Sequence, residues 1–197
     1  MSHVLEPVLG GTPARACAGY WDDGDQLWIS ARDITSAPSR VIVDTTEKIT
    51  SAAVSETKAR PLPVGSVILT ARGTVGEVGR LARPASFNQS CYGFRPDALS
   101  PGLLYFSVLR ATERAKAVAH GSVFDTITMA TFDHLDLAWE PTRAADAESR
   151  IAPLLDAISA AVEENRTLAA TRDALLPQLM SGKLRVRDAE AAASAVL

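Results

Sequence analysis

The pattern of hydrophobic and polar positions changes near residue 140. Before that point, short apolar stretches alternate with Gly, Pro, Ser and Thr, which is typical of strands joined by turns. From Pro141 onward the chain is dominated by Ala, Leu and charged residues, which favour helix. The sequence therefore predicts an α+β protein with three parts: a mixed α and β domain over 1–140, a long coiled-coil-like helix over 141–185 and a frayed tail over 186–197.

Three segments of the first part have the composition of strands. Residues 26–30 and 41–43 are rich in apolar and β-branched side chains, and residues 65–70 read GSVILT. The next stretch, ARGTVGEVG, has a glycine at every third position from residue 73. This spacing predicts a tight turn between two strands, and hence a hairpin.

The rest of the first part predicts one helix and two short apolar stretches. Residues 103–119 have apolar positions at helical spacing. Residues 127–129 and the LDLAW segment over 135–139 are expected to complete the sheet. The three tryptophans are interpreted as core aromatics rather than as stacking platforms. They are Trp21, Trp28 and Trp139.

Residues 146–180 carry a heptad repeat. With Ile151 at position a, seven of the nine a and d positions are apolar over four heptads, which predicts a coiled-coil-like helix of about 40 Å. Asn165 and Arg172 are the polar members of this seam, where polar residues fix register and partner number; alternatively, they lie at the edge of a helix packed on its own domain. Pro177 is expected to bend or end the helix shortly before Gly182 caps it. The predicted dimerisation and docking residues are Ile151, Leu154, Ile158, Asn165, Leu168, Arg172, Leu175 and Leu179.

Composition indicates a folded protein without a uniformly basic surface. Hydrophobic residues make up 47% of the chain, charged residues 22%, and the net charge is -3. Residues 60–116 nevertheless hold eight basic side chains against three acidic ones, which forms a local basic patch unless the charges are scattered. Two isolated cysteines, Cys17 and Cys91, indicate a reducing cytoplasm. The chain has no signal-peptide pattern and no apolar run of membrane-spanning length, so we expect neither export nor membrane insertion.

The sequence contains no set of residues that supports catalysis or metal binding. Its three histidines are isolated from one another and from cysteine, and the acidic turn at 22–25 is interpreted as solvated. RGTVGEVG lacks the Lys-Ser/Thr ending of a nucleotide-binding loop, and no Asn-Pro-Pro-Tyr motif of an amino-methyltransferase occurs. We therefore expect no catalytic residue, no metal and no cofactor bound by this chain. The layout is that of a binding module.

Three blocks of sequence stand out by their order and spacing. The first, GGTPARACAGYWDDGDQLWISARDI, covers residues 10–34, and the second, LPVGSVILTARGTVGEVGRLARPASFNQSCYGFRPD, covers residues 62–97. The third covers residues 141–183 and ends in LLPQLMSGK. In these blocks the chain resembles the specificity subunits of type I restriction-modification systems. It departs from that family at the start of the last helix, where PTRAADAESRI replaces the usual Pro-Pro-Leu-x-Glu-Gln, and in length.

The resemblance implies a half-length specificity subunit, because family members usually carry two target-recognition domains and two helical arms. Residues 1–140 would then be a DNA target-recognition domain that reads half of a bipartite site, and residues 141–185 would dimerise and dock the methyltransferase. The implied partners are double-stranded DNA, the type I methyltransferase (modification) subunit, the restriction/motor subunit, and a second copy of the chain or another S half. Adenosylmethionine, ATP and Mg are expected on the partner subunits. The alternative is a degenerate protein-interaction module that pairs with restriction-modification subunits without reading DNA.

Base reading requires polar side chains on loops, with Arg suited to guanine and Asn or Gln to adenine. The predicted DNA-binding residues are Ser30, Arg32, Arg72, Thr74, Asn88, Gln89 and Ser122. Asn88 and Gln89 have a second interpretation, which is to hold the backbone of a turn, because the resemblance extends to members that read different sequences. Arg72 has a second interpretation as a phosphate contact.

Overall fold

The computed structural model describes residues 5–118, 126–133 and 141–187. Its internal contacts divide the chain into two units, Met1–Ser159 and Ala160–Leu197. The strands are β1 (Val8–Leu9), β2 (Gln26–Ile29), β3 (Val41–Ile42), β4 (Glu47–Ile49), β5 (Val67–Thr70), β6 (Val78–Leu81), β7 (Ala85–Phe87) and β8 (Cys91–Phe94). The α-helices are α1 (Ala31–Ser36), α2 (Ser51–Glu56), α3 (Pro101–Val118), α4 (Met129–Asp133) and α5 (Pro141–Met180), and the 3-10 helices are η1 (Ala18–Tyr20) and η2 (Pro38–Arg40).

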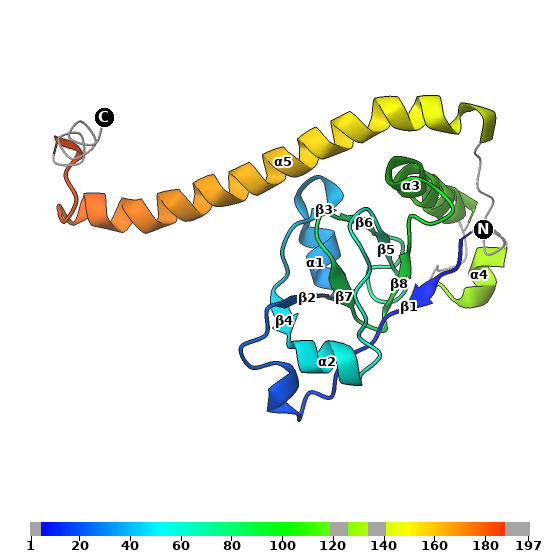
Figure 1. Ribbon diagram of the computed structural model, residues 1–197, viewed down its shortest axis with the longest axis horizontal. Helices are drawn as coiled ribbons and strands as arrows, with labels where there is room; N and C mark the ends of the chain where they lie inside the picture. The colour runs from blue at the N-terminus through cyan, green and yellow to red at the C-terminus, as the bar shows by residue number, and fades with distance from the viewer. Residues whose placement is uncertain (1–4, 119–125, 134–140, 188–197) are drawn as a thin grey trace. The chain divides into compact units, whose positions relative to one another are not determined.

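Two sheets form the centre of the first unit (Figure 1). The larger has the strand order β1-β8-β5-β6-β3, and the smaller has the order β4-β2-β7. In the larger sheet β5 pairs antiparallel with both β6 and β8, whereas β3 pairs parallel with β6. The pairing of β5 with β6, with Ile68 opposite Gly79, confirms the predicted hairpin.

The side chains of β5 alternate between two apolar layers. Val67 and Leu69 belong to a core cluster that includes residues of α3 and α4, whereas Ile68 belongs to a second cluster that includes residues of α1 and of the smaller sheet. Both α1 and α3 pack on β5 and β6 (Figure 1). The larger sheet is therefore covered on both faces, which explains why VILT reads as a continuous apolar run rather than an alternating one.

The turn of the β5–β6 hairpin depends on two glycines and one buried hydroxyl. Gly73 and Gly76 have φ values of +80° and +82°, a region that favours glycine. Thr70 is fully buried, and its Oγ1 accepts a hydrogen bond of 2.9 Å from the backbone N–H of Glu77. The backbone N–H of Gly76 donates to the carbonyl of Thr70 at 2.9 Å. These contacts hold residues 71–77 in one defined loop.

Most predicted elements of the first unit are confirmed, and one is wrong. Strands β2 and β3 and helix α3 lie where the sequence predicts them. Residues 127–129 do not form a strand, because the hydroxyl of Thr131 accepts a hydrogen bond from the backbone N–H of Thr128 and closes the first turn of α4 instead. The LDLAW segment and Trp139 lie outside the described residues. Trp28 is buried as predicted, and Trp21 packs edge-on against it with ring centroids 5.1 Å apart.

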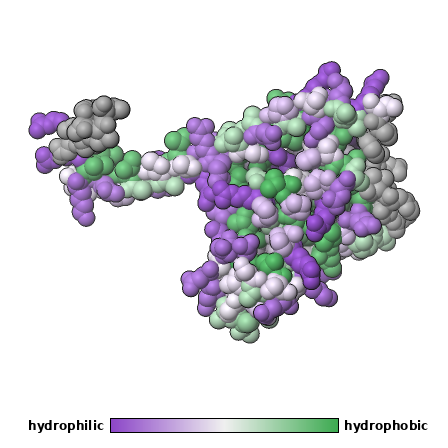
Figure 2. Space-filling view, viewed as in Figure 1, coloured by the Kyte–Doolittle hydropathy of each residue, from purple (hydrophilic) through white to green (hydrophobic). Residues whose placement is uncertain are grey.

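Helix α5 confirms the predicted long helix. It runs for 40 residues, continues three residues past Pro177 and is followed by Gly182 at a φ of +70°. Ile151 is partly buried against the first unit's core, whereas the other heptad positions are exposed. Figure 2 shows apolar side chains at the surface of α5 in the second unit, and Leu168 there is 58% exposed. None of the helices within the described ranges combines the length and the apolarity that crossing a bilayer requires.

Candidate nucleic-acid interface

Backbone hydrogen bonds bring four separate segments together at one end of the two sheets. The N–H of Ala71 donates to the carbonyl of Ser90 at 2.8 Å, which places the hairpin loop beside the β7–β8 turn. The N–H of Asn88 donates to the carbonyl of Ile29 at 2.9 Å, and that of Gly11 donates to the carbonyl of Phe87 at 2.9 Å. We call this edge the loop rim, defined by residues 10–12, 29–32, 71–74 and 88–90.

Strand register explains why these segments meet. Thr70, the last residue of β5, is opposite Cys91, the first residue of β8, so the loops that follow β5 and precede β8 leave the sheet at the same edge. The N–H of Ile127 donates to the carbonyl of Ala71 at 3.0 Å and brings the start of the 126–133 segment to this edge. Ser122 lies outside the described residues, and its predicted role stays a prediction.

Four of the predicted DNA-binding residues are exposed on the loop rim. Arg72 and Thr74 lie in the hairpin loop, Gln89 lies in the β7–β8 turn, and Arg32 lies in the first turn of α1. The fold therefore gathers side chains that are up to 57 positions apart in the chain, between 32 and 89, at one edge. Long polar side chains at such an edge can reach phosphates or base edges of a duplex.

Two further predicted residues use their polar atoms inside the rim. The hydroxyl of Ser30 caps helix α1 by accepting from the Asp33 backbone N–H at 3.4 Å. Oδ2 of Asp33 completes the capping box by accepting from the Ser30 N–H at 2.9 Å, and it also accepts from the Ser30 hydroxyl at 2.6 Å. Oδ1 of Asn88 accepts from the backbone N–H of Ser90 at 3.1 Å. The Asn88 contact supports the interpretation that this side chain holds the backbone of a turn.

Asp33 joins the rim to the loop before β4. Besides its two bonds from Ser30, it accepts hydrogen bonds at Oδ1 from the backbone N–H of Thr46 at 2.9 Å and from the Thr46 hydroxyl at 2.7 Å. Burial by itself would raise the pKa of this carboxyl, but the hydrogen bonds from Ser30 and Thr46 outweigh it and hold the pKa below its ordinary value. The Asp33 carboxylate is therefore ionised at neutral pH and fixes the position of Ser30.

The structure adds one rim residue, Thr12, and a neighbouring cluster around Arg15 to those predicted from the sequence. The hydroxyl of Thr12 donates to Oε1 of Gln89, 77 positions away, so the Gly-Gly-Thr-Pro block holds the β7–β8 turn. Nearby in sequence, the guanidinium of Arg15 lies 3.7 Å from the centre of the Trp21 ring and donates to Oε2 of Glu47 at 2.9 Å. The hydrogen bond from Arg15 holds the pKa of Glu47 below its ordinary value. In the sequence, only the Gly-Thr-Pro motif that contains Thr12 pointed to these residues.

The basic bias of residues 60–116 is weaker at the surface than the sequence count suggests. Arg80 is only 5% exposed and donates hydrogen bonds to helix α5, so it adds no charge to an outer surface. Lys116 pairs with Glu77 at 3.0 Å. The remaining positive charge includes Arg72 on the loop rim, and any DNA contact depends on such individual side chains rather than on a broad basic patch.

Within the described ranges, no group of three or more His, Cys, Asp and Glu side chains is arranged to hold a metal ion. Cys91 is buried, and burial raises the pKa of its thiol to about 12. Cys17 is partly exposed in the segment before η1. The histidines lie outside the described residues.

The chain has a two-sheet domain with polar loops at one edge, followed by a long helix. This is the arrangement of a binding domain with a helical arm. A family model described as the type I restriction modification DNA specificity domain matches residues 8–170. Because that match covers most of the chain, the protein belongs to this family.

Similar proteins are longer than this chain. The type I restriction enzyme MjaIX specificity subunit of Methanocaldococcus jannaschii is 27% identical over 166 residues, which cover 83% of this chain and 38% of that protein. The crystal structure of the type I restriction-modification system S subunit from M. genitalium has a TM-score of 0.57 at 12% identity, covering 89% of this chain and 43% of that one. A chain from a structural study of type I R-M complex assembly and conformational transition has a TM-score of 0.50 at 16% identity, covering 90% and 43%. These likenesses show the fold, and this chain spans less than half the length of each relative.

Proposed function

We propose that this chain reads DNA as the specificity component of a type I restriction-modification complex, with each copy recognising one half of a bipartite site. One observation carries the proposal: a chain of the DNA specificity domain family brings four exposed polar side chains, Arg32, Arg72, Thr74 and Gln89, to a single loop rim. Residues 1–140 then act as the target-recognition domain, and residues 141–185 act as the helical arm.

Reading by the loop rim combines positioning and base contacts. Arg32 and Arg72 can contact phosphates or guanine, while the side chain of Gln89, held by Thr12, faces the same edge. The net charge of -3 limits the number of phosphate contacts, so the chain alone binds DNA weakly. Binding tightens when a methyltransferase adds its own contacts to the duplex.

The arm supplies the protein contacts. Its exposed apolar seam includes Leu154, Leu168 and Leu175, which lose contact with water when a second helix covers them. The partner is a second copy of this chain or another S half, and two identical copies related by a two-fold axis read a spaced palindrome. The arm also docks the methyltransferase subunit, through which the restriction/motor subunit joins the complex.

In this scheme the chain selects the site and does no chemistry itself. The partner subunits supply adenosylmethionine, ATP and Mg, and the methyltransferase modifies an adenine that it flips out of the duplex. The complex acts where the DNA is, in the cytoplasm, where Cys17 and Cys91 stay reduced.

The proposal is tested by selecting DNA with the assembled complex. We would co-purify the chain with its methyltransferase subunit, determine the mass of the complex by native mass spectrometry, and select from a random duplex library. The expected result is a complex with two copies of this chain and enrichment of two short motifs at a fixed spacing. Enrichment that is lost in Gln89→Ala, a change at an exposed rim residue suited to adenine, but retained in Arg110→Ala, an exposed arginine of α3, identifies the rim as the reader. A stable complex that enriches no sequence would refute DNA reading and leave an interaction module.

A further inference from the structure

A buried arginine joins the larger sheet to helix α5 within the first unit. Arg80 lies in β6 and is 5% exposed, and its Nη2 donates hydrogen bonds to the carbonyl of Leu155 and to Oγ of Ser159, both at 2.6 Å. The Ser159 hydroxyl also donates to the Leu155 carbonyl at 2.9 Å. These three groups form a small network in which each polar atom supports the others.

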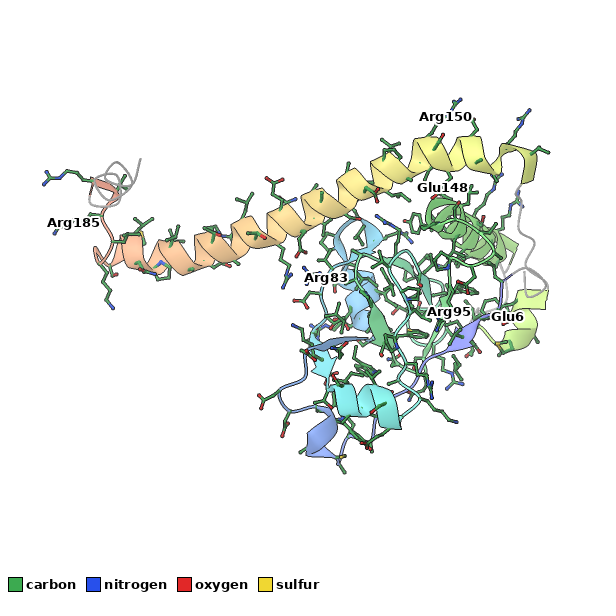
Figure 3. All side chains as sticks on the ribbon, in the orientation of Figure 1. Glu6, Arg83, Arg95, Glu148, Arg150 and Arg185 are labelled. Atoms are coloured by element: carbon green, nitrogen blue, oxygen red, sulfur yellow. The ribbon has the colours of Figure 1, made fainter. Side chains whose placement is uncertain are left out.

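The carboxylate of Glu148 makes a second polar connection, which joins α5 to α3. Oε1 and Oε2 of Glu148 accept hydrogen bonds of 3.0 Å from the backbone N–H groups of Gly102 and Leu103, which lie in the first turn of α3 (Figure 3). These N–H groups have no partner within their own helix, and the helix dipole favours a negative charge there. A Cβ on Gly102 would lie 2.7 Å from both Oε2 of Glu148 and Cγ2 of Ile151, so glycine is required for this close approach.

Apolar contacts fill the space between the two polar connections. Ile151 and Leu155 both pack on the core cluster that contains α3. Together with Glu148 and Ser159 they recur at intervals of three or four residues, so they occupy one face of α5. Leu154 is 65% exposed and lies on another face. The first half of α5 therefore uses one face, which includes the heptad position Ile151, to bind its own domain, and leaves the heptad positions Leu154 and Ile158 exposed.

Sheet stability does not explain an arginine at position 80. Burial disfavours the charged guanidinium and lowers the pKa of Arg80, and apolar side chains of similar volume usually serve a core position at least as well. A guanidinium instead provides directional hydrogen bonds, because its N–H groups have a fixed geometry and require acceptors at particular positions. Here the acceptors are the Leu155 carbonyl and the Ser159 hydroxyl, both in α5.

We infer that Arg80 and Glu148 are positioning residues that hold the base of α5, residues 141–159, on the recognition domain, and that the complex's fixed spacing between half-sites depends on them. This inference rests on the proposed function. Neither residue needs to touch DNA or the methyltransferase to act in this way. When a connection is lost, the domain can shift on its helix, and half-sites one base pair nearer or farther become acceptable. One base pair changes the separation by about 3.4 Å and rotates one half-site by about 35° around the duplex.

The test measures methylation of duplexes that differ only in spacer length. The full chain is co-purified with its methyltransferase, and initial rates are measured on the wild-type motif and on motifs with one base pair added or removed. Arg80→Met is expected to reduce the preference for the native spacer about tenfold, the loss typical of a broken charge-assisted network. Arg80→Lys, which can reach one acceptor at a time, is expected to give an intermediate preference, and Glu148→Gln a smaller loss. Unchanged preference in Arg80→Met and Glu148→Gln would overturn the inference.

Two controls separate positioning from general stability. Arg150→Met makes the same chemical change at a surface site of α5, where Arg150 has a side-chain exposure of 78% (Figure 3). Leu27→Ala destabilises the fold through the other core cluster. Both controls should keep the native spacer preference even when total activity falls. If Arg80→Met does not fold, Ser159→Ala removes one acceptor from the network and carries the same expectation.

A second readout tests the connection without any methylation. Hydrogen exchange of the purified chain should be at least tenfold faster in residues 141–159 of Arg80→Met and of Glu148→Gln than in the wild type, with β5 unchanged. Unchanged exchange in residues 141–159 would overturn the inference even if the wild-type complex methylates nothing. Faster exchange together with an inactive wild-type complex would instead support the connection and count against the proposed function.

Discussion

Replacing Asp33 by Asn should destabilise the fold strongly at neutral pH and much less in acid. The carboxylate accepts four hydrogen bonds, two from Ser30 and two from Thr46. An asparagine keeps one carbonyl oxygen and places an NH₂ group, which cannot accept, where the other oxygen was. One pair of N–H and O–H donors, from Ser30 or from Thr46, therefore loses its acceptor. Loss of the Ser30 pair breaks the capping box of α1, and loss of the Thr46 pair breaks the connection of α1 to the loop before β4.

The expected loss at neutral pH is about 2–4 kcal/mol in the free energy of unfolding. Hydrogen bonds to charged groups contribute about 1.5–3 kcal/mol each, and those that share one carboxylate are not additive. Because the folded-state pKa of Asp33 is lowered, its stabilisation is complete above the ordinary carboxyl pKa and is lost as pH falls through the folded value. The difference between wild type and Asp33→Asn should therefore be largest at pH 6–7 and shrink below about pH 4.

The assay is urea unfolding of the purified chain at pH 7, 5 and 3, followed by tryptophan fluorescence, to which the buried Trp28 contributes. Asp22→Asn, a change at an exposed acid of the same domain, serves as the control and should stay within about 0.5 kcal/mol of the wild type. A loss at pH 7 no larger than that of the control, or a difference that does not shrink in acid, would show that the Asp33 carboxylate does not stabilise the fold in this way.

Three further outcomes are expected. Arg72→Ala should weaken DNA binding to all sequences and lower the slope of log affinity against log salt by about one, because a phosphate contact is lost. An unchanged slope in a salt titration would count against a phosphate contact of Arg72. Leu168→Asp should weaken pairing of the arm by about 3 kcal/mol or more and shift sedimentation toward a monomer, whereas Ala170→Asp, on the opposite heptad face, should not. Equal behaviour of the two variants would show that the heptad seam does not pair. Burial raises the pKa of the Cys91 thiol to about 12, so Cys91 should resist iodoacetamide at pH 8 in the native protein and react in urea, whereas Cys17 should react in both conditions. Labelling of Cys91 in the native protein would show that its surroundings open readily.

The elements with the strongest patterns could be predicted from the sequence. The GSVILT strand and its glycine-rich turn were predictable because both faces of β5 are buried and the turn requires positive φ values. Helices α3 and α5 were predictable because their apolar positions recur at helical spacing over many residues. The capping box of α1 could be predicted from Ser30 and Asp33 at the required separation, although Ser30 was also a predicted DNA-binding residue.

The remaining features depend on contacts between distant parts of the chain. Strands β7 and β8 read ASF and CYGF and contain no β-branched residue, the local signal by which β2 and β3 were predicted. Nothing local distinguishes Arg80 from the exposed arginines, since its acceptors in α5 lie 75 and 79 positions away. The same is true of Thr12 and Gln89, which meet only when the two sheets form. The loop rim is therefore a property of the fold, although most of its polar residues were identified from the sequence.

Genome-wide adenine methylation shows most directly whether this chain selects the DNA site of a type I methyltransferase. The full chain would be co-expressed with its methyltransferase subunit in a host without adenine methylation, beside a strain that expresses the methyltransferase alone. We expect methylation of one bipartite motif with a fixed spacer, only when this chain is present, and a palindromic motif if two copies pair. Formation of the complex with no methylated motif, or the same motif in both strains, would show that this chain does not select the site.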